Sequence, residues 1–122
     1  MRKMIPIVLA LAAAQAFSVA AQSQTLKTVQ DRGSLICGVN PGLEGFASKG
    51  ADGQWSGFDV DFCRAVAAAI FDDPSKVQYV PLSASDRFDA VKNKQIDVLS
   101  RNSSWTMGRE GENGVEIGRA HV

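Results

Sequence analysis

Three short apolar segments alternate with two helical segments between Leu35 and Ser100, and this alternation leaves the chain few possible folds. The apolar segments are rich in Val, Ile and Leu and are bounded by turn residues, which is typical of buried strands. In chain order the expected elements are strand 35–39, helix 59–71, strand 77–82, helix 86–92 and strand 96–100. Strands that alternate with helices over short connections form a parallel sheet with helices on its faces. The expected fold class is therefore α/β, with a β-α-β-α-β core.

Right-handed crossover connections place strand 35–39 between the other two strands of this sheet. Ligands of open parallel sheets bind beyond the carboxyl ends of the strands. In this chain we assign those ends to residues 40–46 and 101–109. A ligand site is therefore expected from these two segments.

Local signals predict two further elements. A helix is expected over 25–33, with Thr25 at its N-cap and Gly33 as its C-terminal stop. Asp52-Gly53 is a strong turn signal, so residues 43–58 are expected to contain a hairpin.

The segment 59–71 is the clearest helix, with Asp59 as its expected N-cap. Two apolar rows follow helical spacing, namely Val60, Cys63, Ala67 and Ile70 in one and Phe62, Val66 and Ala69 in the other. A stripe this broad predicts burial against the sheet. Ser85 is the expected cap of the second core helix.

The first 21 residues have the three-part pattern of a secretory signal peptide. Residues 2–3 are basic, residues 5–17 are apolar, and residues 18–21 are small enough for cleavage after Ala20 or Ala21. The apolar run is shorter than the about 20 residues that span a bilayer. We therefore interpret it as a signal peptide rather than a membrane anchor, and we expect an exported mature protein.

The charge balance argues against some partners. Removing residues 1–21 removes two basic residues and no acidic ones, which leaves 11 basic and 13 acidic side chains. A net charge this close to zero gives no bulk attraction to nucleic acid or to a membrane surface.

Residues 116–122 do not read as native protein. Ile117 to Val122 match the translated start of a common short-read sequencing adapter. We interpret the segment 116–122 as read-through and residues 22–115 as the mature native chain. His121 is the only His, so the native part offers none for catalysis or metal binding.

Cys37 and Cys63 are the only two cysteines. An even number of cysteines in an exported chain favours a disulfide. Cys37 lies in the expected first strand and Cys63 on the helix that should pack over it. Two buried free thiols are the alternative, because Cys also packs as a small hydrophobic residue.

Several separated blocks resemble one known family. Residues 57–67 have the spacing G-x-D-x-D-x-x-x-A-x-A, residues 88–99 fit the next block, and residues 100–109 look like the ligand-binding turn that follows. Across residues 25–109 the chain resembles solute-binding proteins of family 3, which take polar amino acids, and especially their general L-amino-acid-binding branch. The resemblance implies a two-lobed periplasmic-binding-protein fold, of which residues 22–115 form a partial first lobe.

The resemblance also implies roles for residues of the last turn. Arg109 matches the Arg of the family turn, and its planar guanidinium suits bidentate binding of the ligand carboxylate. Thr106 is expected to cap the helix that begins there, whose free amides attract anions. Ser104 stands where a hydroxyl and an amide serve the ligand in relatives. The Asn102 carbonyl is expected to face the ligand ammonium.

Leu43 and Phe46 lie in the loop after the first strand, where relatives place apolar groups against the ligand's side chain. Simple loop packing is the alternative for both. A Leu at position 43 would stack less than a Tyr, which suits broad specificity. Trp105 is expected either to wall the ligand cleft or to join the core, and Trp55 to pack in the hairpin.

The resemblance implies the extracytoplasmic binding component of an ABC importer, which delivers L-amino acids to a membrane permease. No cofactor, metal or enzyme activity is expected. Two alternatives stay open, namely a periplasmic enzyme on the same scaffold, such as a dehydratase, and a sensory ligand-binding domain. An enzyme would need a general acid or base facing the ligand. Glu44, the only acidic residue of the first-strand loop, has no evident partner.

Overall fold

The computed structural model describes residues 17–111 of the 122-residue chain. The chain divides into two compact units, Met1–Arg32 and Gly33–Val122. Most of the expected signal peptide, and the whole segment 116–122, lie outside the described residues. The interpretations of both segments therefore remain expectations.

The described part of the first unit is the helix α2 (Phe17–Arg32). The sequence predicted a helix that starts at Thr25, and this start is wrong. Residues 17–24 contain neither Gly nor Pro, so nothing interrupts the helix ahead of Thr25. Gly33 follows the helix with a φ of +74°, as expected for its stop. Within residues 17–111, no helix combines the length and apolar character that crossing a bilayer requires.

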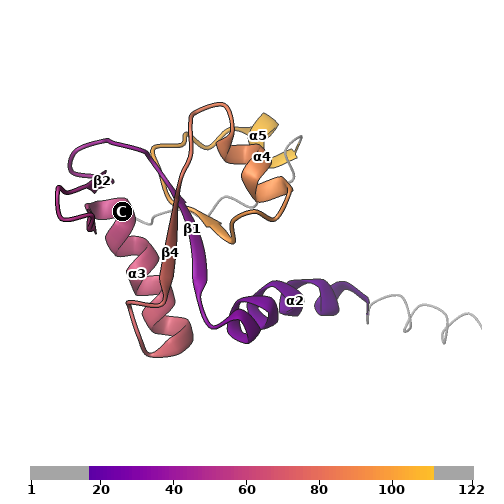
Figure 1. Ribbon diagram of the computed structural model, residues 1–122. Helices are drawn as coiled ribbons and strands as arrows, with labels where there is room; N and C mark the ends of the chain where they lie inside the picture. The colour runs from indigo at the N-terminus through magenta and orange to yellow at the C-terminus, as the bar shows by residue number, and fades with distance from the viewer. Residues whose placement is uncertain (1–16, 112–122) are drawn as a thin grey trace, which may run out of the picture. The chain divides into compact units, whose positions relative to one another are not determined.

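The second unit is built around a parallel sheet of three strands, β1 (Leu35–Val39), β4 (Val77–Pro81) and β5 (Val98–Leu99) (Figure 1). Their order is β4-β1-β5, which confirms the predicted central position of β1. Four of the five β1 residues are buried, as expected for a strand with a neighbour on each edge.

Helices supply the crossovers between these strands. Helix α3 (Phe58–Phe71) connects β1 to β4, and α4 (Arg87–Lys92) connects β4 to β5. A last short helix, α5 (Met107–Gly111), follows β5. Helix α3 packs against β1 and β4, whereas α4 packs against β5, and Figure 1 shows the two helices on opposite sides of the strands. These features confirm the α/β class and the β-α-β-α-β core.

Only one of the two predicted apolar rows of α3 is well buried. Val60, Cys63 and Ala67 are fully buried, whereas Phe62 is 51% exposed. The predicted burial of Phe62 is therefore wrong. Phe58, one turn earlier, is 70% exposed. A helix that lies on one face of a sheet buries a single stripe, and these two rings lie outside it.

The predicted hairpin is present. Strands β2 (Ser48–Lys49) and β3 (Trp55–Ser56) pair in antiparallel fashion. In the turn, Gly53 has a φ of +79°, and the Gln54 amide donates to Asp52 Oδ1 at 3.0 Å. Trp55 packs against the core, with its ring centroid 6.0 Å from that of Tyr79.

The N-cap predicted for α3 is wrong. Gly57 precedes the helix, and Asp59 lies in its first turn. The amides of Phe58 and Asp59 donate to the carbonyls of Gly45 and Phe46, each at 2.9 Å. The loop therefore supplies the acceptors that a capping side chain would otherwise provide.

Helix α4 is also capped differently from expectation. Its N-cap is Asp86 rather than Ser85. The Ser83 hydroxyl accepts the Asp86 amide hydrogen at 3.2 Å. The hydroxyls of Ser83 and Ser85 both donate to the Asp86 carboxylate, and they hold the pKa of Asp86 below its usual value. The loop before α4 is thus closed by its own side chains.

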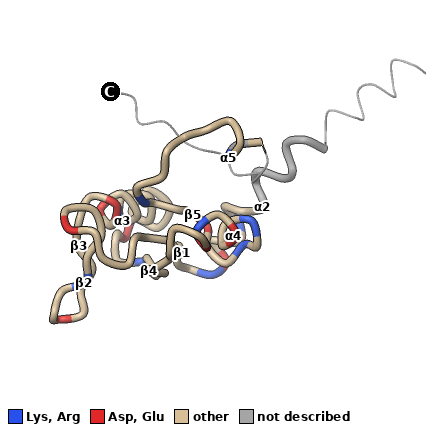
Figure 2. Tube along the Cα trace, turned by 90° about the horizontal axis from the view of Figure 1, so that it is seen from above, with Lys and Arg blue, Asp and Glu red and all other residues tan. Residues whose placement is uncertain are grey.

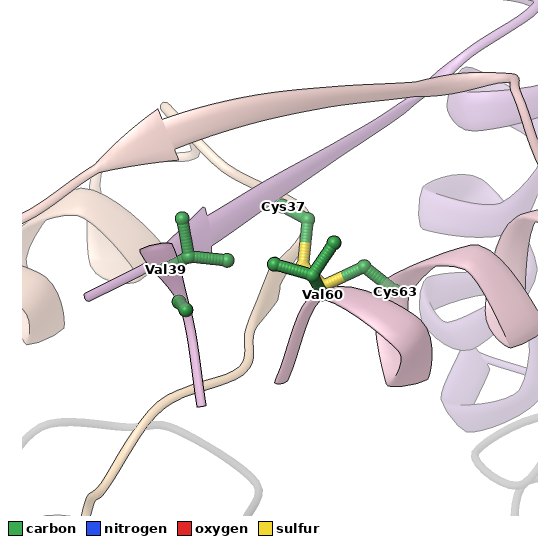
Figure 3. Close-up of a cluster of buried hydrophobic side chains, with 5 residues drawn as sticks. Cys37, Val39, Val60 and Cys63 are labelled. Carbon is green, nitrogen blue, oxygen red and sulfur yellow. A yellow bond between two sulfur atoms is a disulfide. The ribbon is translucent and has the colours of Figure 1, made fainter. Parts of the chain in front are cut away.

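The core of this unit lies between β1 and α3. Its buried members are Cys37, Val39, Ala47, Val60 and Cys63. A disulfide joins Cys37 of β1 to Cys63 of α3, with the two Cα atoms 6.3 Å apart. Figure 3 shows this bridge beside Val39 and Val60. The bridge therefore links sheet and helix at the centre of the core.

Candidate ligand-binding site

The loops that follow β1 and β5 meet at the carboxyl edge of the sheet. Asn40 follows β1, and its Nδ2 donates to Oδ1 of Asn102, which follows β5, at 3.2 Å. The Gly42 amide donates to Asn40 Oδ1 at 3.0 Å, within the first loop. The structure therefore brings together the two segments in which the sequence located a ligand site.

The turn that leads into α5 is closed by its own hydrogen bonds. The Thr106 hydroxyl accepts the Arg109 amide hydrogen at 3.3 Å, so the predicted helix cap is confirmed. Arg109 Nη1 donates to the Ser104 carbonyl, which sets the direction of the side chain. Ser104 and Thr106 are exposed, and Arg109 is half-buried. Trp105 is 45% exposed and is not a core residue.

Two guanidinium groups lie over the ring of Phe88. The Cζ atoms of Arg87 and Arg109 are 4.9 and 5.0 Å from its centroid, within cation–π range. Arg87 is only 9% exposed, and its Nη1 donates to the Asn102 carbonyl at 3.3 Å. Burial lowers the pKa of Arg87, and the charges of Arg101 and Arg109 lower it further. Figure 2 shows basic residues around α4, with acidic residues between them.

Arg101 joins the end of β4 to the turn after β5. Its Nη1 donates to the Leu82 carbonyl, and its Nη2 donates to Asn102 Oδ1 at 3.2 Å. The nearby carboxyl group is that of Asp59, in the first turn of α3. Burial raises the pKa of Asp59, and the positive charge of Arg101 partly offsets this effect. Arg87, Arg101 and Arg109 are called the arginine cluster below.

Among the side chains that the structure describes, no member of the arginine cluster forms an ion pair with a carboxylate. Several buried atoms at this edge also lack a hydrogen-bond partner within the described residues, namely Asp59 Oδ2, Arg87 Nε, Arg101 Nε and Ser103 Oγ. Each buried polar atom without a partner costs about 1–3 kcal/mol. Polar groups supplied from outside would therefore be stabilised here.

Leu43 and Phe46 lie in a tight turn on the neighbouring loop. The Leu43 amide donates to the Ala47 carbonyl at 2.8 Å, and the Ala47 amide returns a bond to the Leu43 carbonyl at 2.9 Å. Leu43 is half-buried, and Phe46 is 45% exposed. Their contact with a ligand's side chain stays a prediction.

Sequence analysis gave no binding role to three residues that the structure places at this edge, namely Arg87, Arg101 and Asp59. For Arg87 the omission has a clear cause, because the segment after β4 was left out of the expected site. All strands of a parallel sheet end on the same edge, so the residues after Leu82 carried the same signal as the other two segments. Arg101 stood within the expected segment 101–109, yet its side chain had no assigned partner.

The chemistry of this edge suits an anion rather than a metal. In the part of the chain that the structure describes, no group of three or more His, Cys, Asp or Glu side chains could hold a metal ion. Apart from the carboxyl group of Asp59, the groups that meet at the edge are guanidinium, amide and hydroxyl donors. Guanidinium groups bind carboxylates through paired, charge-assisted hydrogen bonds.

A family model described as bacterial extracellular solute-binding proteins, family 3, matches residues 35–114. The chain is 55% identical over 91 residues to the general L-amino acid-binding periplasmic protein AapJ of Rhizobium johnstonii, covering 75% of this chain and 27% of AapJ. It is 55% identical over 93 residues to the glutamate/glutamine/aspartate/asparagine-binding protein BztA of Rhodobacter capsulatus, covering 76% and 28%. The chain thus spans between a quarter and a third of these relatives.

The solved structures that this chain resembles are also periplasmic binding proteins or amino-acid-binding proteins. A periplasmic binding protein from Brucella ovis with glutathione bound is 56% identical, with a TM-score of 0.73 over 74% of this chain and 28% of that one. The cysteine-binding protein from Campylobacter jejuni is 26% identical, with a TM-score of 0.67 over 70% and 34%. The described unit therefore has the fold of one part of a periplasmic binding protein.

Proposed function

The chain belongs to family 3 of the bacterial extracellular solute-binding proteins, and we propose that it is the substrate-binding component of an ABC importer for L-amino acids. It would bind its ligand in the periplasm and deliver it to a membrane permease. The amino acid would lie between two lobes, the first of which provides the edge formed by the loops after β1 and β5.

The observation that carries this proposal is the half-buried Arg109 in a turn closed by hydrogen bonds. Its side chain is directed by the Ser104 carbonyl and its backbone by the Thr106 cap. A guanidinium fixed in this way is prepared for a carboxylate, and the hydroxyls of Ser104 and Thr106 in the same turn are further donors. The Asn102 carbonyl, which accepts from Arg87, is a weaker candidate for the ligand ammonium.

The names of the relatives support binding over catalysis. Those at 47–55% identity are all named as binding proteins, for amino acids in general or for glutamate, glutamine, aspartate and asparagine. The Brucella ovis protein was solved with glutathione, a tripeptide. An α-amino carboxylate is common to all these ligands, which fits a site built around Arg109.

Arg109→Gln should reduce amino-acid affinity by about 100-fold, because it removes charge-assisted hydrogen bonds worth about 1.5–3 kcal/mol each. The measurement is calorimetric titration of the full-length mature protein with a panel of L-amino acids. Arg64→Gln is the matched control, because the hydrogen bonds of Arg64 go to Asp61 and to the Trp55 carbonyl rather than to residues of the expected site. The proposal fails if the parent protein binds no amino acid, or if both variants bind like the parent.

We further propose that residues 1–21 are removed on export, that residues 22–115 form part of lobe one, and that residues 116–122 are not native. The test is to sequence the gene from genomic DNA past the codon for Val115. A reading frame that continues into a second α/β lobe is expected. A frame that ends natively after Val122 would overturn this division of the chain.

A further inference from the structure

The arginine cluster holds more positive charge than one α-carboxylate would use. Three guanidinium groups meet at this edge. The carboxyl group of Asp59 interacts electrostatically with one of them, that of Arg101. Asp86, at the start of α4, is instead held by the hydroxyls of Ser83 and Ser85. The three guanidinium groups and Asp59 together therefore carry a net charge of about +2 at neutral pH.

Arg87 is the member that most requires a counterion. It is more than nine-tenths buried, and its Nε is buried without a partner among the described residues. Its one hydrogen bond among those residues goes to the Asn102 carbonyl, and its guanidinium also faces the ring of Phe88. Both contacts stabilise a cation, but neither neutralises it. A desolvated charge is costly until an opposite charge joins it.

The geometry of the cluster allows one small ligand to reach two arginines. Arg87 and Arg109 are 4.9 and 5.0 Å from the same ring centroid, so their guanidinium carbons are at most about 10 Å apart. Arg101 joins Arg87 through Asn102, whose carbonyl accepts from Arg87 and whose Oδ1 accepts from Arg101. A molecule with two carboxylates on a short carbon chain can span a separation within this limit.

We propose that Arg87 and Arg101 form a second carboxylate site beside Arg109, and that the preferred ligand is an L-amino acid with an acidic side chain. This inference rests on the proposed function, because it assigns the α-carboxylate to Arg109. Arg87 provides the buried charge for the side-chain carboxylate. Arg101 holds Asn102 in place and adds a second donor.

A purely structural role for these arginines makes a different prediction. Arg87 ties α4 to the turn after β5, and Arg101 ties the end of β4 to the same turn. Losing such a tie would loosen the whole turn, so every amino acid should lose affinity to the same extent. Losing a carboxylate site should affect acidic ligands and spare their amides.

The test is calorimetric titration of the full-length mature protein with glutamate and glutamine, and with aspartate and asparagine. Each pair has nearly the same shape and differs in one charge. The parent protein should bind each acid at least tenfold more tightly than its amide. Arg87→Gln and Arg101→Gln should each weaken glutamate about 10- to 100-fold, change glutamine by less than threefold, and so remove the preference. Arg64→Gln should leave all four affinities unchanged.

Equal or tighter binding of the amides by the parent protein would overturn the inference while leaving the proposed function intact. Equal losses for acid and amide in the variants would also overturn it. No binding of any amino acid would end both proposals. Circular dichroism shows whether the Gln variants fold. If they do not, the inference is tested by the ratio of acid to amide affinity, measured for the parent protein and for Arg101→Lys, which keeps the charge.

Discussion

Gly57 occupies a position that no other residue fits without strain. Its φ is +122°, and a Cβ built there would lie 2.4 Å from the Phe46 carbonyl oxygen. That oxygen cannot easily move, because it accepts the Asp59 amide hydrogen at 2.9 Å. Gly57 therefore allows the loop that carries Phe46 to lie directly on the start of α3.

Gly57→Ala should lower the free energy of unfolding by about 1–3 kcal/mol, because the new methyl group meets backbone and the φ value disfavours it. Urea titration followed by circular dichroism measures this loss. Gly42→Ala is the control, since a Cβ there meets nothing within 4 Å, and its effect should stay within about 0.5 kcal/mol. Similar losses in the two variants would contradict the steric argument.

Asp59→Asn tests the cost of a buried carboxylate. Burial raises the pKa of Asp59 above 3.8 in the folded protein. The folded state is therefore stabilised by protonated Asp59, fully so below the unfolded-state pKa. This stabilisation is lost as the pH rises through the folded-state pKa. Asn keeps the shape but does not titrate. The variant should therefore melt at a higher temperature than the parent near pH 7, and the difference should shrink toward about pH 3. A difference that does not vary with pH would count against this account.

Residue roles could be predicted where the partners are close in sequence. The Thr106 cap reaches the amide of Arg109, three residues away, and was predicted correctly. The contacts of Arg87 and Arg101 span 15 and 19 residues. A long side chain has many rotamers, and only the folded arrangement of β4 and the turn after β5 selects one. Sequence could mark these arginines as polar but could not give their direction.

Helices and strands could be predicted where the spacing of apolar residues indicates which side of the element is buried. The apolar run of β1 and the row Val60, Cys63 and Ala67 on α3 gave the central strand and the helix that covers it. The ends were less predictable, because their determinants lie elsewhere in the chain. The start of α3 depends on the carbonyls of Gly45 and Phe46. A capping rule that considers only the residues next to the helix start does not include these two carbonyls.

The bridge between β1 and α3 should contribute much of the stability of this unit. Cys37 and Cys63 are 26 residues apart, and closing a loop of that length in the unfolded chain corresponds to about 3–4 kcal/mol. Replacing both residues by Ala should lower the free energy of unfolding by this amount in urea titrations. Dithiothreitol should destabilise the parent similarly and leave the double variant unchanged. Two free thiols in the denatured, unreduced parent would refute the bridge.

At the scale of the whole molecule, the chain spans between 27% and 34% of the length of its relatives at 47–55% identity. The loops of one edge offer several donors for a carboxylate, whereas the carboxyl groups that they offer to an ammonium are those of the buried Asp59 and the exposed Glu44. A protein made of residues 22–115 alone should therefore bind glutamate about 100-fold more weakly than the full-length protein. Calorimetry on both proteins, with circular dichroism to show that the shorter one folds, measures this ratio. Affinities within tenfold of each other would contradict the expectation.

The sheet places its first strand in the middle. Cys37 of β1 pairs with Tyr79 on one side and with Val98 on the other. During synthesis, β1 leaves the ribosome before either neighbour exists, and one of its edges stays open until β5 has emerged. An apolar strand with open edges readily pairs with other chains. The sheet is thus assembled from its centre outward, and the interval between the emergence of Val39 and that of Leu99 is when the nascent chain most needs protection.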